Sequence, residues 1–200
     1  MDGEYQVGRV LRSSTASFTV GCRQLIAEQD KMTPKLGALL KAKGSDGRVV
    51  YGMTCNVTIE DDAFVRQLVA AGVESAEIIE DQRQKRQVPV VVDVIIVGHG
   101  DGTRYYHRLP PQPPHTLDEI YTCGNAELRE FTESHGWIRL VLPTFDAPVD
   151  QIIVAALRMA SEARPTNMER EPYLVSAGRE LAKLLALDLT RLDGILAQLR

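Results

Sequence analysis

The spacing of apolar residues changes along this 200-residue chain, and that change constrains the fold more than any other feature. In roughly the first half, apolar and polar side chains alternate over short runs, as at Phe18, Val20 and Cys22, which would share one face of a strand. In the last third, apolar residues recur every three or four positions, which is the period of a helix. The chain is therefore predicted to be an α+β protein, with strands first and helices after them.

Glycines inside the predicted strands indicate a curved sheet. Gly8 and Gly52 lie within β-rich runs, where glycine favours the bulges and bends that closing a small barrel requires. Residues 88–97 form the most apolar run, whose near-continuous character indicates a strand covered on both faces. We expect a small N-terminal β-barrel over residues 1–114, ended by the proline-rich Leu109–Pro114 segment.

A charged segment interrupts the β-rich part near residues 60–87. Phe64, Leu68 and Val69 follow one another there at helical spacing. Residues 60–81 contain seven acidic residues and one basic residue, a net charge of −6, and residues 82–87 carry +3. The pattern predicts an acidic, solvated helical insertion between two strands of the barrel.

Residues 115–200 are predicted to form an α-rich region with one short strand. We expect a short helix over 125–134, a strand over 137–142, an amphipathic helix over 149–160 and two more helices, the first opened by Pro172. The last two helices carry more apolar surface than they need to cover each other, which predicts a homo-oligomer through these helices or through an unpaired barrel edge. The candidate interface residues are Leu184, Leu185, Leu192, Ile195, Leu196 and Leu199.

Composition excludes several classes of protein. A formal net charge of −4 disfavours a main role in nucleic-acid binding, which usually needs a basic excess. No apolar run is long enough for a signal peptide or a membrane span. Cys22, Cys55 and Cys123 are widely spaced, odd in number and without a CxxC pair, which favours reduced thiols in a cytoplasmic protein.

No motif for catalysis, a cofactor or a metal is found. The chain has no GxxxxGK[ST] loop, so ATP hydrolysis is not expected, and it has no GxSxG nucleophile motif. The glycines of residues 98–102 precede an aromatic run rather than a helix, which favours a hairpin turn over a dinucleotide site. His99, His107, His115, Cys123 and His135 are too irregularly spaced for a structural zinc site.

Asp93 stands in the middle of the most apolar run. A buried carboxylate is costly unless it is paired or hydrogen-bonded, so a structural ion pair is the simpler interpretation. The candidate partners are Arg9, Arg12 and Arg104. The alternative is a ligand site, or a hydrolytic site, at the junction of barrel and helices around Asp93, Tyr106 and His107.

Several segments resemble the HAS-barrel, the small β-barrel at the front of HerA-type DNA translocases and of ATP-synthase subunits. Val7–Val10, a Ser/Thr-rich break and Ser17–Val20 are similar to its opening. Leu36–Leu40, Val49–Met53 and Val90–Val97 are similar to later strands, and the proline-rich exit is followed by Ile120-Tyr121 where HerA-type proteins have a Val-Tyr pair.

The resemblance covers about residues 1–125, and the motor domain that follows it in HerA-type translocases has no counterpart here, because the P-loop is missing. The resemblance therefore implies a non-catalytic interaction or assembly module in a DNA-processing or ring-ATPase context. Its implied partners are a motor ATPase or a nuclease, and further copies of the chain. No cofactor is implied.

Overall fold

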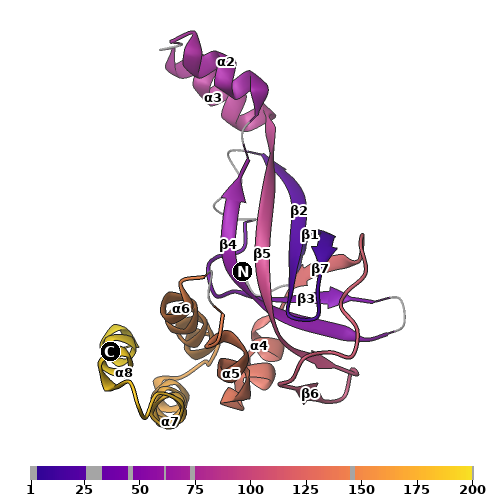
Figure 1. Ribbon diagram of the computed structural model, residues 1–200. Helices are drawn as coiled ribbons and strands as arrows, with labels where there is room; N and C mark the ends of the chain where they lie inside the picture. Colours follow the sequence, from indigo (N-terminus) through magenta and orange to yellow (C-terminus); the bar gives the residue numbers. More distant parts are fainter. Residues whose placement is uncertain are drawn as a thin grey trace.

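The computed structural model describes residues 4–25, 33–44, 47–60, 62–72, 75–144 and 147–199. The protein is α+β, as predicted, with a β-barrel followed by a group of helices and with a helical arm at the opposite end of the barrel (Figure 1). The strands are β1 (Gln6–Ser13), β2 (Ser17–Leu25), β3 (Leu39–Lys43), β4 (Val49–Ile59), β5 (Gln87–Gly100), β6 (Tyr105–Tyr106) and β7 (Glu119–Thr122). The helices are α2 (Ala63–Ala70), α3 (Ala76–Lys85), α4 (Asn125–Thr132), the 3₁₀ turn η2 (His135–Trp137), α5 (Ile138–Val141), α6 (Val149–Glu162), α7 (Asn167–Leu184) and α8 (Leu189–Leu199).

Six antiparallel strands close the predicted barrel. They run in the order β2, β1, β7, β3, β4, β5, and β5 pairs back with β2, while the short β6 adds to the end of β5. Gly8 and Gly52 both lie at register shifts, as expected of glycines in a closing barrel. β7 lies between β1 and β3, so one barrel strand comes from beyond the boundary placed at residue 114.

Two apolar clusters meet at β5. Val94 and Ile96 point into the barrel, whereas Ile95 and Val97 point to the helices that cover its outer face. This half of β5 is covered on both sides, as predicted. The first half is not: only Val88, Val90 and Val92 are buried there, and the residues that alternate with them are partly exposed.

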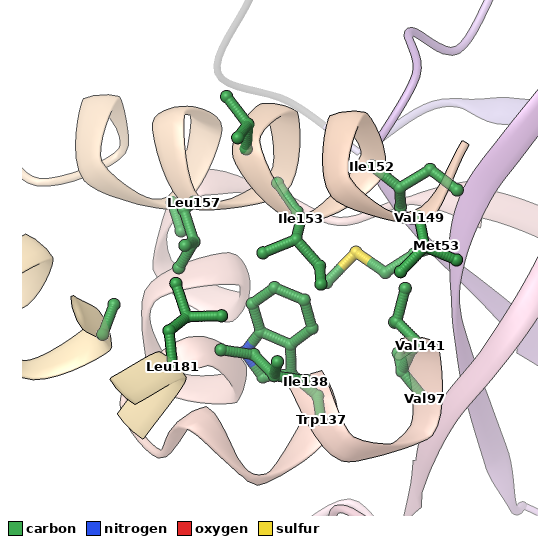
Figure 2. Close-up of a cluster of buried hydrophobic side chains, with 14 of the residues drawn as sticks. Met53, Val97, Trp137, Ile138, Val141, Val149, Ile152, Ile153, Leu157 and Leu181 are labelled. Carbon is green, nitrogen blue, oxygen red and sulfur yellow. The ribbon is translucent and has the colours of Figure 1, made fainter. Parts of the chain in front are cut away.

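The outer cluster joins the barrel to the helices (Figure 2). Met53 of β4 reaches toward Trp137, Val97 of β5 lies beside Val141, and α6 lies over them with Ile152 and Ile153. All of these side chains are fully buried. The C-terminal region is therefore packed onto the barrel wall.

The strand predicted over residues 137–142 is wrong: the segment forms the end of η2 and then α5. Its buried residues Trp137, Ile138 and Val141 have helical spacing, but a six-residue apolar run does not distinguish a buried helix from a strand. Pro172 does not open a helix either. It lies inside α7, which begins at Asn167.

The candidate interface leucines lie against the helices of their own chain. Leu185, Leu192 and Ile195 are buried, and the half-buried Leu184, Leu196 and Leu199 pack against the same cluster. α8 contacts both α6 and α7. Much of the stripe is thus covered internally, and the homo-oligomer stays a prediction.

The predicted acidic insertion is confirmed as two helices, α2 and α3, which extend the β4–β5 hairpin away from the barrel (Figure 1). We call residues 62–86 the arm. Neither of its helices has a buried residue. Among the described residues, no helix has the length and apolarity needed to cross a membrane.

Candidate functional site

A row of polar residues crosses four strands on the outer face of the barrel. Strand register places Arg12 of β1 opposite Thr19 of β2, Thr19 opposite Asp93 of β5, and Asp93 opposite Asn56 of β4. Directly opposed residues of neighbouring strands have their side chains close together. We call these four residues the polar row.

Both ends of the polar row follow an irregularity in strand pairing. The β1–β2 register shifts between Val10 and Arg12, and the β4–β5 register shifts between Thr54 and Asn56. Bulges of this kind redirect side chains and occur often next to binding sites. Here they place the side chains of Arg12 and Asn56 on either side of Asp93.

Hydrogen bonds link the row into one network. Thr19 Oγ1 accepts a bond from Arg12 Nε at 3.1 Å and donates one to Asp93 Oδ1 at 2.9 Å. Asn56 Nδ2 donates to Asp93 Oδ2 at 3.2 Å. Of the three candidate arginines, Arg12 is the one that approaches Asp93, with Nη2 at 3.9 Å from Oδ1. Arg9 instead pairs with Glu119 at 2.7 Å.

The expectation that Asp93 is buried is wrong, because its side chain is 33% exposed. It faces a cleft of about 1090 Å³ at the junction of barrel and helices. The cleft is lined by the polar row, by the β1–β2 turn, by β4 and β5, by the segment before β3, and by the segment leading into α6. Its other lining residues are Ser13, Ser14, Ser17, Phe18, Pro34, Leu36, Cys55, Val57, Val94, Ile95, Thr144, Ala147 and Pro148.

Cys55 lies in the cleft but is not activated. Burial and the nearby charge of Asp93 raise the pKa of its thiol to about 11. The thiol donates to the Asp93 carbonyl at 3.2 Å. A neutral thiol in this position is a poor nucleophile, so the chemistry that the cleft offers is charge and hydrogen bonding. All three cysteines are free.

The other two residues of the predicted site do not join Asp93. Tyr106 of β6 pairs with His99 of β5. His99 lies six residues after Asp93 on that strand, and six residues of a strand span about 20 Å. Its hydroxyl donates to Asp101 at 3.1 Å. His107 packs edge-on to Phe131 and donates through Nε2 to the Phe131 carbonyl at 2.9 Å. Burial lowers the pKa of His107, which favours its neutral form.

Sequence reasoning missed a second cluster of ionisable groups, which fastens α4 to the barrel. Lys41 of β3 is almost fully buried and forms ion pairs with Glu127 of α4 and, at 2.9 Å, with Glu4. Tyr51, opposite Lys41 in the sheet, donates to Glu127 at 2.8 Å. We call Lys41, Tyr51 and Glu127 the α4 clamp.

Lys41 and Tyr51 of the α4 clamp both keep their protons near neutral pH. Burial alone would lower the pKa of Lys41, but its bonds to Glu127 and Glu4 outweigh that and raise it. Burial and the bond to Glu127 raise the pKa of Tyr51, and burial raises that of the nearby Cys123. Lysine therefore stays charged, and tyrosine and thiol stay neutral, across the physiological range.

Histidines do not gather at a metal site. His99 stacks on Tyr106, while His135 is buried beside Tyr173 at a ring distance of 5.1 Å. Within the described ranges, no three His, Cys, Asp or Glu side chains are grouped so that they could hold a metal ion.

Comparison with protein-family models and with curated protein sequences finds no match to this chain.

Proposed function

We propose that this chain is a non-catalytic interaction module and that the arm is its docking element. The observation that carries the proposal is a set of exposed apolar side chains on a projecting helix pair. Phe64 and Val69 of α2 and Ile78 and Ile79 of α3 are exposed, as is Ile59 at the root of the arm. Val69 is 76% exposed.

The arm has little to stabilise it in isolation. Its helices have 8 and 10 residues, and isolated helices shorter than about 12–15 residues are marginal in water. Ordering each residue costs about 1–2 kcal/mol, and neither α2 nor α3 has a buried side chain to offset that cost. A partner that covers the exposed apolar residues would contribute about 25 cal/mol for each Å² removed from water.

The root of the arm is held in place even though its surface is open. Asp62 caps α2 by accepting bonds from the backbone amides of Phe64 and Val65. The guanidinium of Arg86 donates to the same carboxylate at 2.6 Å and lies 4.3 Å from the centre of the Phe64 ring. The contacts join the two ends of the arm where it leaves the β4–β5 hairpin.

Charge on the arm is mixed. Residues 74–81 contain four acidic residues and no basic one, residues 82–86 contain three basic residues, and the arm as a whole has a net charge of −1. Lys85 of α3 pairs with Asp81. The exposed apolar side chains are therefore complementary to an apolar protein surface with charges of both signs at its edge. We therefore expect a protein partner of that composition.

The resemblance to the HAS-barrel suggests where to look for it. In that family the barrel docks partners of DNA-translocating ATPases, so a motor ATPase or a nuclease is the first partner to test. Such a setting is cytoplasmic, and free cysteines fit it. The chain would act there as a free-standing adaptor.

Binding of the full chain to the HerA-type ATPase and to its nuclease from the same organism tests the proposal. We expect Val69→Glu with Ile78→Glu to weaken binding at least tenfold, because buried charges oppose docking. The matched control is Val175→Glu with Leu187→Glu, which changes two exposed apolar residues of the helical region. Equal binding by the arm variant, or no binding of either protein at micromolar concentration, would contradict the proposal. A dimer that the arm variant dissociates would make a second copy the occupant.

A second candidate function is binding of a small molecule, or its hydrolysis, at the junction of barrel and helices. The observation in its favour is the cleft, which has Asp93 on its wall.

A further inference from the structure

We infer that the cleft binds a small zwitterion, namely an α-amino acid with an apolar side chain. The inference deepens the second candidate function and does not depend on the arm. Three observations support it: the polar row, the hydrogen-bond donors and acceptors of the row that have no partner in the row, and the apolar side chains beside it.

The unused hydrogen-bonding capacity of the row is of two opposite kinds. Asp93 Oδ1 accepts one hydrogen bond from Thr19, and Oδ2 accepts one from Asn56. A carboxylate can accept about four hydrogen bonds, so Asp93 can accept about two more. Arg12 donates one hydrogen bond, from Nε to Thr19. Its two terminal nitrogens remain to donate, and its side chain is 81% exposed. The cleft thus offers acceptors for an ammonium group and donors for a carboxylate.

The two charges are adjacent but not fully engaged with each other. Arg12 Nη2 lies 3.9 Å from Asp93 Oδ1, beyond hydrogen-bond distance. An ion pair with one partner so exposed contributes little to stability, so a ligand can separate it at low cost. Thr19 is bonded to both groups and holds them side by side. A ligand with adjacent ammonium and carboxylate groups can bind both, whereas a ligand with a single charge leaves one unpaired.

Part of the neighbouring surface is apolar. Leu36 and Pro148 line the cleft with accessible side chains, and the buried Ile95 follows Asp93 on the same face of β5. At about 1090 Å³, the cleft is slightly larger than the usual 300–1,000 Å³ of small-molecule sites, so it can hold an apolar side chain next to the polar row. The expected ligands are amino acids such as leucine or phenylalanine.

Calorimetric titration of the full chain with L-leucine and L-phenylalanine tests the inference. We expect saturable binding, and at least tenfold weaker binding of 3-methylbutylamine and of 4-methylpentanoate, which are leucine without its carboxylate and without its ammonium group. Asp93→Asn and Arg12→Gln should each weaken binding of the amino acid at least tenfold. The matched control is Arg9→Gln, which breaks an exposed ion pair of the same kind elsewhere on the barrel and should leave binding unchanged.

The inference is wrong if neither amino acid binds below about 10 mM, or if the amine or the acid alone binds as tightly as leucine. Equal weakening by Arg9→Gln would also overturn it. The arm variant Val69→Glu with Ile78→Glu should bind the amino acid normally, so a failure of the docking proposal and a failure of this inference can be told apart.

Discussion

Helices are attached to the barrel in two regions, and the two attachments have opposite character. Of the C-terminal helices, α5 and α6 are packed on the barrel wall, α7 and α8 are packed on α6, and α6 alone has eight buried residues. The arm has exposed apolar residues and no buried one in either helix. Amphipathic sequence in the first region stabilises the fold, whereas in the arm it remains available for another molecule. The difference teaches that apolar helical spacing identifies a contact surface but not the molecule that it contacts.

The largest expected effect is in the covered region. Trp137 is fully buried between the barrel wall and α6 (Figure 2). Trp137→Ala would leave a cavity there and lower the free energy of unfolding by about 4 kcal/mol. Chemical denaturation measures the loss. The matched change on the arm is Phe64→Ala. An equal fall in the free energy of unfolding of that variant would mean that the two regions do not differ in how their apolar residues stabilise the fold.

Breaking the α4 clamp should have the next largest effect. Lys41→Met removes one partner of a buried ion pair and leaves the carboxylates of Glu127 and Glu4 without this cation. We expect the free energy of unfolding to fall by about 3 kcal/mol and the Tm to fall with it in calorimetry. Lys43→Met, which changes a more exposed lysine on the same strand, serves as the control. A loss below that of the control would mean that the clamp does not fasten α4.

The clamp also makes stability sensitive to alkali. The pKa values of Cys123, Tyr51 and Lys41 are all raised in the folded protein, so the unfolded chain releases these protons at lower pH than the folded chain does. The contribution of these three groups to the free energy of unfolding should therefore be constant near neutrality and fall as pH rises above the ordinary pKa values of 9.0 to 10.5. Tyr51→Phe should lose about 1 kcal/mol at pH 7 and should show a shallower fall above pH 10. Denaturation at a series of pH values checks this, and an identical slope in both proteins would contradict it.

The smallest effect is expected on the arm. Val69→Glu replaces a side chain that is 76% exposed and should change the free energy of unfolding by less than about 0.5 kcal/mol. Thermal denaturation of the chain without a partner measures it. A large loss would show that Val69 is covered in the folded chain, and the arm would then belong to the same class as the C-terminal helices.

Much of the fold follows from local patterns in the sequence. Alternation at Phe18 and Val20 predicts a strand, and the glycines at positions 8 and 52 predict the irregular pairing of a closing barrel. Helical spacing over 149–160 predicts α6. Each of these features depends on residues within a few positions of one another.

The features that could not be predicted from the sequence depend on contacts between residues far apart in the chain. Helical packing, rather than the apolar run itself, decides that Trp137–Val141 is not a strand. Asp93 is partly exposed, as are the residues on the same face in that half of β5, and the apolar run itself does not reveal this. Lys41 looks like an ordinary exposed lysine until the register places Tyr51 opposite it and α4 brings Glu127. The polar row likewise needs the register of four strands before Arg12 and Asn56 can be placed beside Asp93.

Amide hydrogen exchange of the full chain, read separately for α3 and for residues 88–97 of β5, tests the docking account most directly. In the free chain we expect α3 to exchange orders of magnitude faster than β5, because elements without buried contacts open at low free-energy cost. Added partner should then slow exchange in the arm and leave the barrel unchanged. Equal protection of α3 and β5 in the free chain at every protein concentration would contradict the account, since it would mean that the arm is already fully stabilised within its own chain.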